Sequence, residues 1–311
     1  MKYCIGVDGG GTKTLTYLGD MAGHILDSCV FGPSNYYSSG LENTKKVFGS
    51  IVNYYCLKHQ FDYSDLVFIS LGLAGVDREM DKQVIRDIFV ELNITCDIMV
   101  YNDARTALVG ALGKDEGVII VSGTGSIATG IRDNRLVRVG GWGHILGDEG
   151  SGYDIGMKTL KAIMKSYDGR LSPTLMTEKV IEFLELDDVE DIIGFVHDSN
   201  TDKKKIAELA IVAVQAAKEK DTLALAIMDE SVEALLELAN TVIRKLYSVD
   251  ESAELTYIGG IITNVGYIRD SFITKIKKDY PNLTIKKPAQ DGAVGALYLG
   301  WSKYGVSYQQ S

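Results

Sequence analysis

The chain has 311 residues, which is long for one ordinary domain and suits two. Hydrophobic residues make up 46% and charged residues 24% of it, a composition typical of folded globular proteins and not of disordered ones. The formal net charge of −10 argues against nucleic-acid binding, which needs a basic face. An anionic ligand would have to be held locally, by backbone N–H groups, a metal ion and a few cations.

The N-terminus and the cysteines indicate a cytoplasmic protein with no membrane partner. Residues 1–8 reach a charge at Asp8 without an apolar segment long enough for a signal peptide. No stretch approaches the roughly 20 apolar residues that span a membrane. The cysteines form neither a CxxC pair nor a zinc-type spacing, and we expect buried, reduced thiols. They are Cys4, Cys29, Cys56 and Cys96.

The first third of the chain reads as short strands followed by helices. Apolar runs bounded by turn residues predict the strands, and apolar residues at helical spacing predict the helices. The predicted strands cover residues 3–7, 14–18, 25–31, 66–71 and 98–101. The predicted helices begin near Leu41 and cover residues 84–92 and 104–112.

The pattern then restarts at Val118. A strand over 118–121, a glycine-rich turn and strands over 127–131 and 136–139 repeat the order strand, small-residue loop, strand, turn, strand. Residues 8–12 and 122–126 fall at the same place in each block. The repetition predicts an α/β protein built from two copies of one unit that face each other.

The rest of the chain completes the second unit. Residues 157–247 are mostly helical by periodicity, and the remaining predicted elements are strands over 255–258 and 283–285 and helices over 265–276 and 291–299. We expect an N-terminal domain over 1–115, with the C-terminal helix in 290–311 packing back on it. We expect a C-terminal domain over 116–289, with a helical extension at about 155–250.

The loop after the first strand predicts a phosphate site. Three successive glycines let backbone N–H groups form a concave nest for an anion, and Asp8 at the strand end is placed to hold hydrated Mg²⁺. A P-loop is excluded, because Thr12 stands where that motif needs Lys and the glycines lead into a second strand. A plain glycine-rich hairpin is the alternative. The predicted phosphate-binding residues are Gly9, Gly10, Gly11, Thr12 and Lys13.

Two loops of the second block extend this site. The turn at 122–126 resembles the first loop, because it also has small residues and hydroxyl groups at the end of a strand. Gly259 and Gly260 follow a later strand and would let a nucleotide base lie close to the backbone. Each loop is also explained by a tight turn. The predicted nucleotide contacts here are Ser122, Gly123, Thr124, Gly125, Gly259 and Gly260.

Asp103 is the candidate catalytic residue. Asn102 and Asp103 close the last strand of the first block, where an Asp is commonly a helix N-cap. A carboxylate facing a cleft there would instead accept the proton of an attacking hydroxyl in phosphoryl transfer.

The segment 140–152 predicts a sugar site. It holds six glycines, an indole, an imidazole and two carboxylates, the kinds of groups that bind sugar faces and hydroxyls. His144 is read as a sugar contact or a structural residue in preference to a general base, and Asp148 or Glu149 could cap the next helix. Asn35, in a polar turn, is a further sugar ligand or a simple turn residue. The predicted sugar-binding residues are Asn35, Trp142, Gly143, His144 and Asp148.

These motifs resemble those of N-acetylglucosamine kinases in the BadF/BadG/BcrA/BcrD ATPase family of the actin/hexokinase/Hsp70-like superfamily. The resemblance runs nearly from Met1 to Trp301. It rests on residues 8–14, 102–104, 122–126, 140–151 and 259–260.

The resemblance implies two ribonuclease-H-like (actin-like ATPase) domains around a central cleft that holds ATP, Mg²⁺ and a sugar. It implies Asp103 as the base and a 6-phosphosugar as the product, from N-acetylglucosamine, N-acetylmuramic acid or both. Kinases of this type can form homodimers. Ala74 stands where mammalian-type enzymes have a serine near the sugar, so glucosamine or glucose is an alternative substrate.

Two other classes compete with the kinase. One is an ATP-driven activator of a dehydratase or reductase, which binds a [4Fe–4S] cluster between subunits, but no cysteine here lies in a glycine-rich loop of the second block. The other is a non-catalytic actin-like or sugar-sensing module, and the intact Asp103 and both phosphate loops argue against it.

Overall fold

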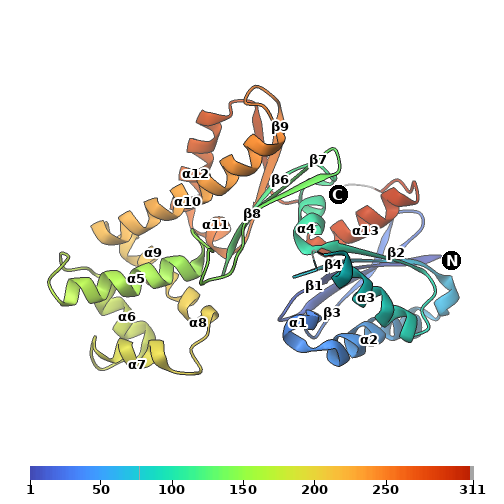
Figure 1. Cartoon of the computed structure of the whole chain (residues 1–311), viewed down its shortest axis with the longest axis horizontal. Coiled ribbons are helices and arrows are strands. Elements are labelled where there is room, and N and C mark those ends of the chain that lie inside the picture. Colours follow the sequence, from blue (N-terminus) through green and yellow to red (C-terminus); the bar gives the residue numbers. More distant parts are fainter. Residues whose placement is uncertain (77, 309–311) are drawn as a thin grey trace. The chain divides into compact units, whose positions relative to one another are not determined.

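The computed structural model describes residues 1–76 and 78–308 of the chain (Figure 1). It divides into two compact units, and each is described by itself. The N-terminal unit comprises Met1–Gly117, Ile131–Arg135 and Lys286–Ser311. The C-terminal unit comprises Val118–Gly130 and Leu136–Ile285.

A five-stranded mixed sheet forms the centre of the N-terminal unit, with strand order β3-β2-β1-β4-β5. The central strand β1 pairs antiparallel with β2 and parallel with β4, so β1 and β4 end at the same edge of the sheet. That edge therefore carries the loop that follows β1. The strands are β1 (Tyr3–Gly9), β2 (Thr14–Asp20), β3 (Ile25–Phe31), β4 (Leu66–Leu73) and β5 (Asp97–Asn102).

Helices cover both faces of this sheet (Figure 1). Buried side chains of α2 and α3, including Phe48 and Phe89, share one apolar core with β1 and β4. On the other face α4 and α13 pack against each other and against β1 and β4. The helices are α1 (Tyr36–Ser39), α2 (Leu41–His59), α3 (Glu79–Glu91), α4 (Asp103–Leu112) and α13 (Gly292–Lys303), with a short 3₁₀ turn, η1 (Tyr63–Asp65).

Glycine allows α4 and α13 to pack backbone against backbone. A Cβ atom at Gly295 of α13 would lie 1.9 Å from the carbonyl oxygen of Thr106 on α4, closer than any side chain can stand. This contact fixes the start of both helices relative to the sheet. The C-terminal end of α13 is anchored by Trp301, which is fully buried and donates a hydrogen bond from Nε1 to the carbonyl oxygen of Asp20 at 2.8 Å.

The C-terminal unit repeats the same sheet. Its strand order is β10-β9-β6-β7-β8, which matches the first sheet when β6 takes the place of β1 and β9 that of β4. β6 and β9 run parallel. The predicted duplication of one α/β unit is therefore confirmed. The strands are β6 (Gly117–Ser122), β7 (Ser126–Arg132), β8 (Arg135–Gly140), β9 (Ala253–Ile258) and β10 (Leu283–Lys286).

Most of the C-terminal unit is helical, as expected, and its helices share one core with the sheet. α10 runs beside α12 (Figure 1), and α5 contacts α8, α9 and α10. The helices are α5 (Gly152–Tyr167), α6 (Met176–Leu184), α7 (Asp191–His197), α8 (Lys203–Glu208), α9 (Ala210–Lys218), α10 (Thr222–Leu246), α11 (Gly260–Asn264) and α12 (Gly266–Asp279).

Three short helices depart from the sequence prediction. The apolar stripe from Ile206 to Ala217 is divided between α8 and α9, because the chain tightens to i→i+3 bonding at Leu209. The polar turn after residue 34 contains α1, and α11 begins directly at Gly260. Within the described residues, every helix is too short or too polar to cross a lipid bilayer.

Substitution of Gly295 tests the α4–α13 contact. We expect Gly295→Ala to lower the free energy of unfolding by about 3 kcal/mol or more, because the added methyl group overlaps the Thr106 carbonyl oxygen. Gly194→Ala on α7 is the matched control: its Cβ would meet no atom within 4 Å, so it should be neutral or stabilise by about 0.5–1 kcal/mol. If thermal unfolding showed the same change in Tm for both variants, it would contradict this packing.

Candidate functional site

The loop after β1 is accessible and rigidly held. Gly11, Thr12 and Lys13 are exposed, and the turn is closed by a hydrogen bond from Gly10 N–H to the Lys13 carbonyl oxygen at 3.0 Å. The Gly10 carbonyl oxygen accepts from the backbone N–H groups of Ser34 and Asn35. The loop thus presents its outer backbone to a ligand while its inner backbone is bonded to the unit.

Three carboxylates gather below this loop. Burial, together with the nearby charges of Asp103 and Asp291, raises the pKa of Asp8 to about 6. Asp291 is held by the start of α13, where its Oδ1 accepts from two backbone N–H groups, and by Tyr17 Oη, which donates to Oδ2 at 2.9 Å. The structure therefore brings Asp8 and Asp103 together and adds Asp291.

Asp103 stands at the first position of α4 and does not cap it. The N-cap is Asn102, whose Oδ1 accepts from Ala104 N–H at 2.8 Å. Asp103 Oδ1 accepts from the same N–H at 2.9 Å, and its carbonyl oxygen accepts from Thr106 Oγ1. The carboxylate is half-buried and fixed in direction by the helix start, which is the local geometry that a positioned base requires.

This group of carboxylates fits a divalent cation only in the presence of a ligand. Within residues 1–76 and 78–308, no cluster of three or more His, Cys, Asp or Glu side chains is arranged to hold a metal ion. Mg²⁺ in kinases is held by one or two carboxylates together with substrate phosphates and water. The half-buried, mutually repelling carboxylates of Asp8, Asp103 and Asp291 fit that mode, since a cation would relieve the repulsion.

Asn35 lies beside the first phosphate loop. Its Oδ1 accepts from Tyr37 N–H at 3.0 Å and caps α1, and its amide nitrogen lies next to Gly75. Tyr36 and Tyr37 each donate from Oη to Asp81 Oδ1 at 2.7 Å, which ties α1 to α3. Asn35, a predicted sugar-binding residue, thus lies in the same unit as Asp103. Its segment is held by hydrogen bonds to the first loop at one end and to α3 at the other.

The loop between β6 and β7 is held by the segment that follows β8. Ser122 Oγ donates to the Gly150 carbonyl oxygen at 2.8 Å, and Ser126 Oγ donates to that of Glu149 at 2.7 Å. The start of α5 reaches the loop through Gly152 N–H, which donates to the Gly123 carbonyl oxygen at 2.8 Å. Thr124, at the tip, is exposed. The loop is fixed at its base and open at its tip.

Asp148 is part of this brace. It is only 6% exposed, and its Oδ1 accepts from the backbone N–H of Ser126 at 3.2 Å. It does not cap the next helix, and neither does Glu149: Ser151 is the N-cap of α5, with Oγ accepting from Asp154 N–H. The observed contact of Asp148 is with the phosphate loop, and its role toward a sugar stays a prediction.

Gly259 and the phosphate loop are in direct contact. A Cβ atom at Gly259 would lie 2.4 Å from the Ser122 carbonyl oxygen, and the residue has φ 103°, which side chains rarely adopt. The β6 and β9 strand ends therefore lie backbone to backbone. The structure brings together the predicted nucleotide residues of the second block, which the sequence separates by more than a hundred positions.

A cavity of about 250 Å³ opens at this contact. Gly123 and Thr124 line it from the phosphate loop, and Gly260 lines it from the start of α11. Gly152, at the end of the 140–152 segment, also lines the cavity, although the sequence placed that segment at a sugar site. Sequence reasoning missed the rest of the wall, because no motif marks Lys204, Ala207, Glu208 or Ile261.

The segment before Asp148 exposes large apolar side chains. Trp142 is 66% exposed, with the Arg138 guanidinium 5.1 Å from its ring centroid, while Ile145 and Leu146 are 84% and 78% exposed. The rings of His144 and Tyr153 meet edge to face at 5.0 Å. Exposed aromatic and apolar side chains on a glycine-rich loop are typical of a ligand-binding surface.

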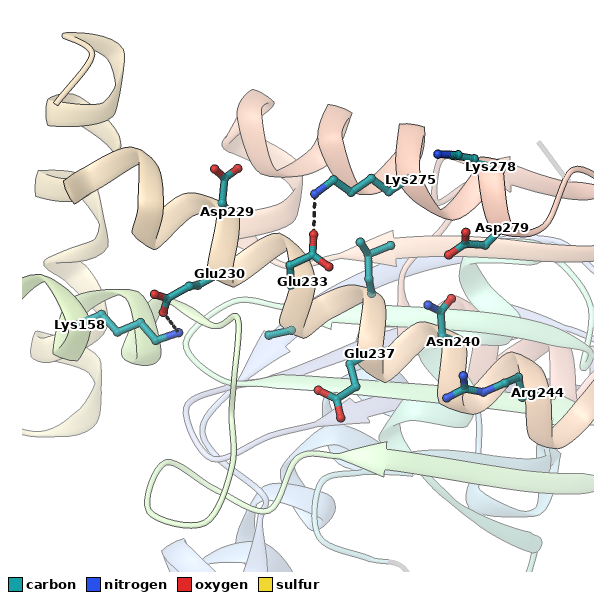
Figure 2. A pocket seen from close by; sticks show the side chains of 12 residues that line it. Lys158, Asp229, Glu230, Glu233, Glu237, Asn240, Arg244, Lys275, Lys278 and Asp279 are labelled. Carbon is teal, nitrogen blue, oxygen red and sulfur yellow. Dashed lines mark hydrogen bonds and ion pairs between the residues drawn. The ribbon is translucent and has the colours of Figure 1, made fainter. Parts of the chain in front are cut away.

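A larger groove, of about 960 Å³, runs along α10 and α12 (Figure 2). Its walls are charged with both signs, and Figure 2 shows Lys158 paired with Glu230 and Lys275 paired with Glu233. The groove includes none of the residues predicted for the site. Size alone would therefore point to a surface of the C-terminal unit other than the predicted one.

Comparison with known proteins places the chain. The profile of the BadF/BadG/BcrA/BcrD ATPase family matches residues 5–300. The chain belongs to this family. The resemblance seen in the motifs is thereby confirmed, and membership in this ATPase family carries the use of ATP with it.

Two characterised relatives are similar over nearly their whole length. An N-acetylmuramic acid/N-acetylglucosamine kinase of Clostridium acetobutylicum is 38% identical over 304 residues, covering 97% of this chain and 99% of the relative. An N-acetyl-D-glucosamine kinase of Dictyostelium discoideum is 36% identical over 307 residues, covering 95% and 96%.

Solved structures share the fold. A candidate N-acetylglucosamine kinase from Chromobacterium violaceum has a TM-score of 0.76 and 26% identity, covering 96% of this chain and 99% of its own. A ROK-family glucokinase from Streptomyces griseus has a TM-score of 0.56 at 15% identity, covering 96% and 99%, which shows likeness of fold alone. The predicted α/β fold with two actin-like units is confirmed.

The raised pKa of Asp8 has a consequence for stability. Between the ordinary carboxyl pKa of 3.8 and the folded value of about 6, the folded protein binds more protons than the unfolded chain, so stability falls as pH rises through this window. We expect Asp8→Asn to raise Tm by a few degrees at pH 7.5, corresponding to about 1–3 kcal/mol. The gain should vanish near pH 4, where Asp8 is protonated.

Asp187→Asn, on an exposed residue, is the control for loss of one negative charge. A fall in Tm for Asp8→Asn at pH 7.5, or a change equal to that of the control, would contradict the account of Asp8 as a buried, repelled carboxylate.

Proposed function

We propose that the protein is an ATP-dependent amino-sugar kinase, which transfers the γ-phosphoryl group of ATP to the 6-hydroxyl of N-acetylglucosamine, N-acetylmuramic acid or both. The observation that carries the proposal is the proximity of Asp103, a fixed carboxylate at a helix start, to the half-buried Asp8 below an exposed glycine loop. The names of the relatives from Clostridium acetobutylicum and Dictyostelium discoideum support this substrate class.

In the proposed reaction Asp103 accepts the proton of the sugar 6-hydroxyl while that oxygen bonds to the γ-phosphorus and the bond to the β-phosphate oxygen breaks. The products are a 6-phosphosugar and ADP. Mg²⁺, held by Asp8 and by the phosphates, supplies charge neutralisation when bound. The proposed phosphate donors are backbone N–H groups of one glycine loop in each unit, residues 9–12 and residues 122–125, so most of the rate comes from positioning and charge stabilisation.

In the proposal, two sets of residues bind the sugar. Asn35 offers an amide beside Gly75, and an amide group can both donate to and accept from the N-acetyl group. Trp142, with Gly143 and His144, offers an exposed ring for the apolar face of the sugar or of its acyl substituent. Asp148 is proposed to use its remaining acceptor sites for the sugar, since its Oδ1 already accepts one hydrogen bond from the loop between β6 and β7.

The cysteines argue against the activator of a dehydratase. Burial raises the pKa of Cys4 and of Cys96 to about 12 and that of Cys56 to about 11, so these groups stay protonated at neutral pH. Iron–sulfur clusters bind thiolates. Cys29, the fourth, is also a free thiol. Free thiols fit the reducing cytoplasm, where we place the enzyme.

The test is ADP release coupled to NADH oxidation, with ATP, Mg²⁺ and a panel of N-acetylglucosamine, N-acetylmuramic acid, N-acetylmannosamine, glucosamine and glucose. We expect turnover with one or two N-acetylated sugars. We expect Asp103→Asn to lower kcat by about 10²–10⁴-fold and to leave KM for ATP nearly unchanged, because it removes proton acceptance and keeps the shape of the side chain. Because the substitution also removes a charge that repels Asp8, it should not lower Tm. Asp187→Asn serves as the charge control.

Near-normal kcat in Asp103→Asn would overturn the assignment of the base. ATP hydrolysis that is indifferent to every sugar would overturn the kinase itself and would point to the activator class, for which iron content is the next measurement.

A further inference from the structure

The helix α1, which has Asn35 as its N-cap, is too short to be stable by itself. It has four residues, and isolated helices of fewer than about 12 residues are marginal in water. Its position must therefore come from contacts with the rest of the N-terminal unit. The hydroxyls of Tyr36 and Tyr37 bond it to Asp81 on α3, and among residues 1–76 and 78–308 no other side-chain hydrogen bond joins α1 to another element.

Both tyrosines use the same oxygen of Asp81. Successive residues of a helix project about 100° apart and do not normally meet at one partner. Here the rings of Tyr36 and Tyr37 stack with their centroids 4.2 Å apart, and both hydroxyls donate to Asp81 Oδ1 at 2.7 Å. The other oxygen, Oδ2, accepts from the backbone N–H of Arg78 at 3.2 Å, at the start of α3. Each carboxylate oxygen of Asp81 therefore has a defined partner.

Asp81 is also buried and charged. Its side chain belongs to a residue that is only 6% exposed. The hydrogen bonds from Tyr36 and then from Tyr37 hold the pKa of Asp81 below its ordinary value, so that it is a carboxylate at neutral pH. Burial of a carboxylate costs free energy that its hydrogen bonds must offset, and a buried polar group whose bonds are all made keeps its neighbours rigid. Asp81 thus fixes α1 against α3 in one arrangement.

The arrangement of α1 determines where the amide of Asn35 lies. Asn35 Oδ1 accepts from the Tyr37 backbone N–H at 3.0 Å, so the direction of this side chain follows the position of Tyr37. A Cβ atom at Gly75 would lie 3.8 Å from the Asn35 amide nitrogen and 3.6 Å from the Tyr37 ring. Within the described ranges that nitrogen donates to no protein atom. The amide N–H groups are therefore held beside Gly75 and available to a ligand.

We propose that Asp81 is a positioning residue for sugar binding, which fixes α1 through Tyr36 and Tyr37 and thereby directs the Asn35 amide at the N-acetyl group of the sugar. The amide N–H donates to the acetyl carbonyl oxygen. The exposed Tyr37 ring limits the space beside that amide. Asp81 acts from beneath α1 and makes no contact with the sugar. The inference rests on the proposed function, which assigns Asn35 to the sugar.

Steady-state kinetics of the full chain test this with N-acetylglucosamine or, if it is the better substrate, N-acetylmuramic acid. We expect Asp81→Ala to raise KM for the sugar about 10-fold, the equivalent of one hydrogen bond, and to change kcat and KM for ATP by less than about 2-fold. The double variant Tyr36→Phe/Tyr37→Phe should do the same, because it removes both donors and leaves Asp81 at the start of α3.

The conservative variant Asp81→Asn separates the hydrogen bonds from the charge. Its amide can still bond to both tyrosine hydroxyls, since a hydroxyl donates and accepts. We expect KM for the sugar to stay within about 2-fold of the wild-type value, because the bonded geometry of α1 is retained.

A double-mutant cycle shows whether Asp81 acts through Asn35. Asn35→Ala should raise KM for the sugar about 10-fold. Addition of Asp81→Ala should raise it by no more than about 2-fold further, because the amide that Asp81 positions is already absent. Two effects that multiply in full would show that Asp81 acts by another route and would overturn the proposal.

Matched controls lie in the same unit. Asp87→Ala removes an exposed carboxylate of α3, and Tyr63→Phe removes a hydroxyl that donates to Asn53, so both should match wild type. An unchanged KM for the sugar in Asp81→Ala, or equal increases in KM for sugar and ATP, would overturn the proposal while wild-type turnover leaves the kinase assignment intact. Absence of sugar turnover in the wild type would overturn the kinase and this inference with it.

Discussion

The approach of the Gly259 backbone to the carbonyl of Ser122 is the contact on which the arrangement of the proposed nucleotide loops in the C-terminal unit depends. The parallel strands β6 and β9 end side by side, and only glycine fits at this distance and at φ 103°. The contact aligns two loops whose exposed atoms are mainly backbone. An acidic chain can hold a polyphosphate in this way, since it supplies oriented N–H groups without an excess of basic side chains.

The segment between β8 and α5 both holds the 122–126 loop in place and exposes side chains to solvent. Ser122, Ser126 and Asp148 tie the phosphate loop to residues 148–150, and Gly152 ties it to α5. The same short segment carries the exposed Trp142 a few residues earlier. The position of the 122–126 loop, the exposed surface around Trp142 and the placement of α8 are therefore coupled through one glycine-rich stretch.

The N-terminal unit differs, because carboxylate side chains and not only backbone N–H groups form its predicted site. Its site concentrates negative charge, and burial together with Asp103 and Asp291 raises the pKa of Asp8 to about 6. Such an arrangement costs stability in the free protein and is retained where function requires it. A bound cation would attract these carboxylates and so relieve their repulsion. The arrangement would therefore be more stable with the proposed Mg²⁺ and phosphates bound than without them.

Much of the fold and part of the candidate site could be predicted from the sequence. Strands, the glycine loops and the repeat were readable because each depends on local patterns: apolar runs, turn residues and their order. The partnership of Asp291 with Asp8, the burial of Asp148 and the wall formed by Lys204 and Glu208 were not readable. They arise from packing between distant segments, such as Gly156 against Ile206, which leaves no local signal.

The most direct test of the account is the chemical identity of the product. Phosphorus NMR of the mixture formed by the enzyme, Mg·ATP and N-acetylglucosamine should show a phosphate monoester coupled to the two protons on carbon 6, growing in equal amount with ADP. Release of inorganic phosphate with no such ester, for every N-acetylated sugar tried, would contradict the account.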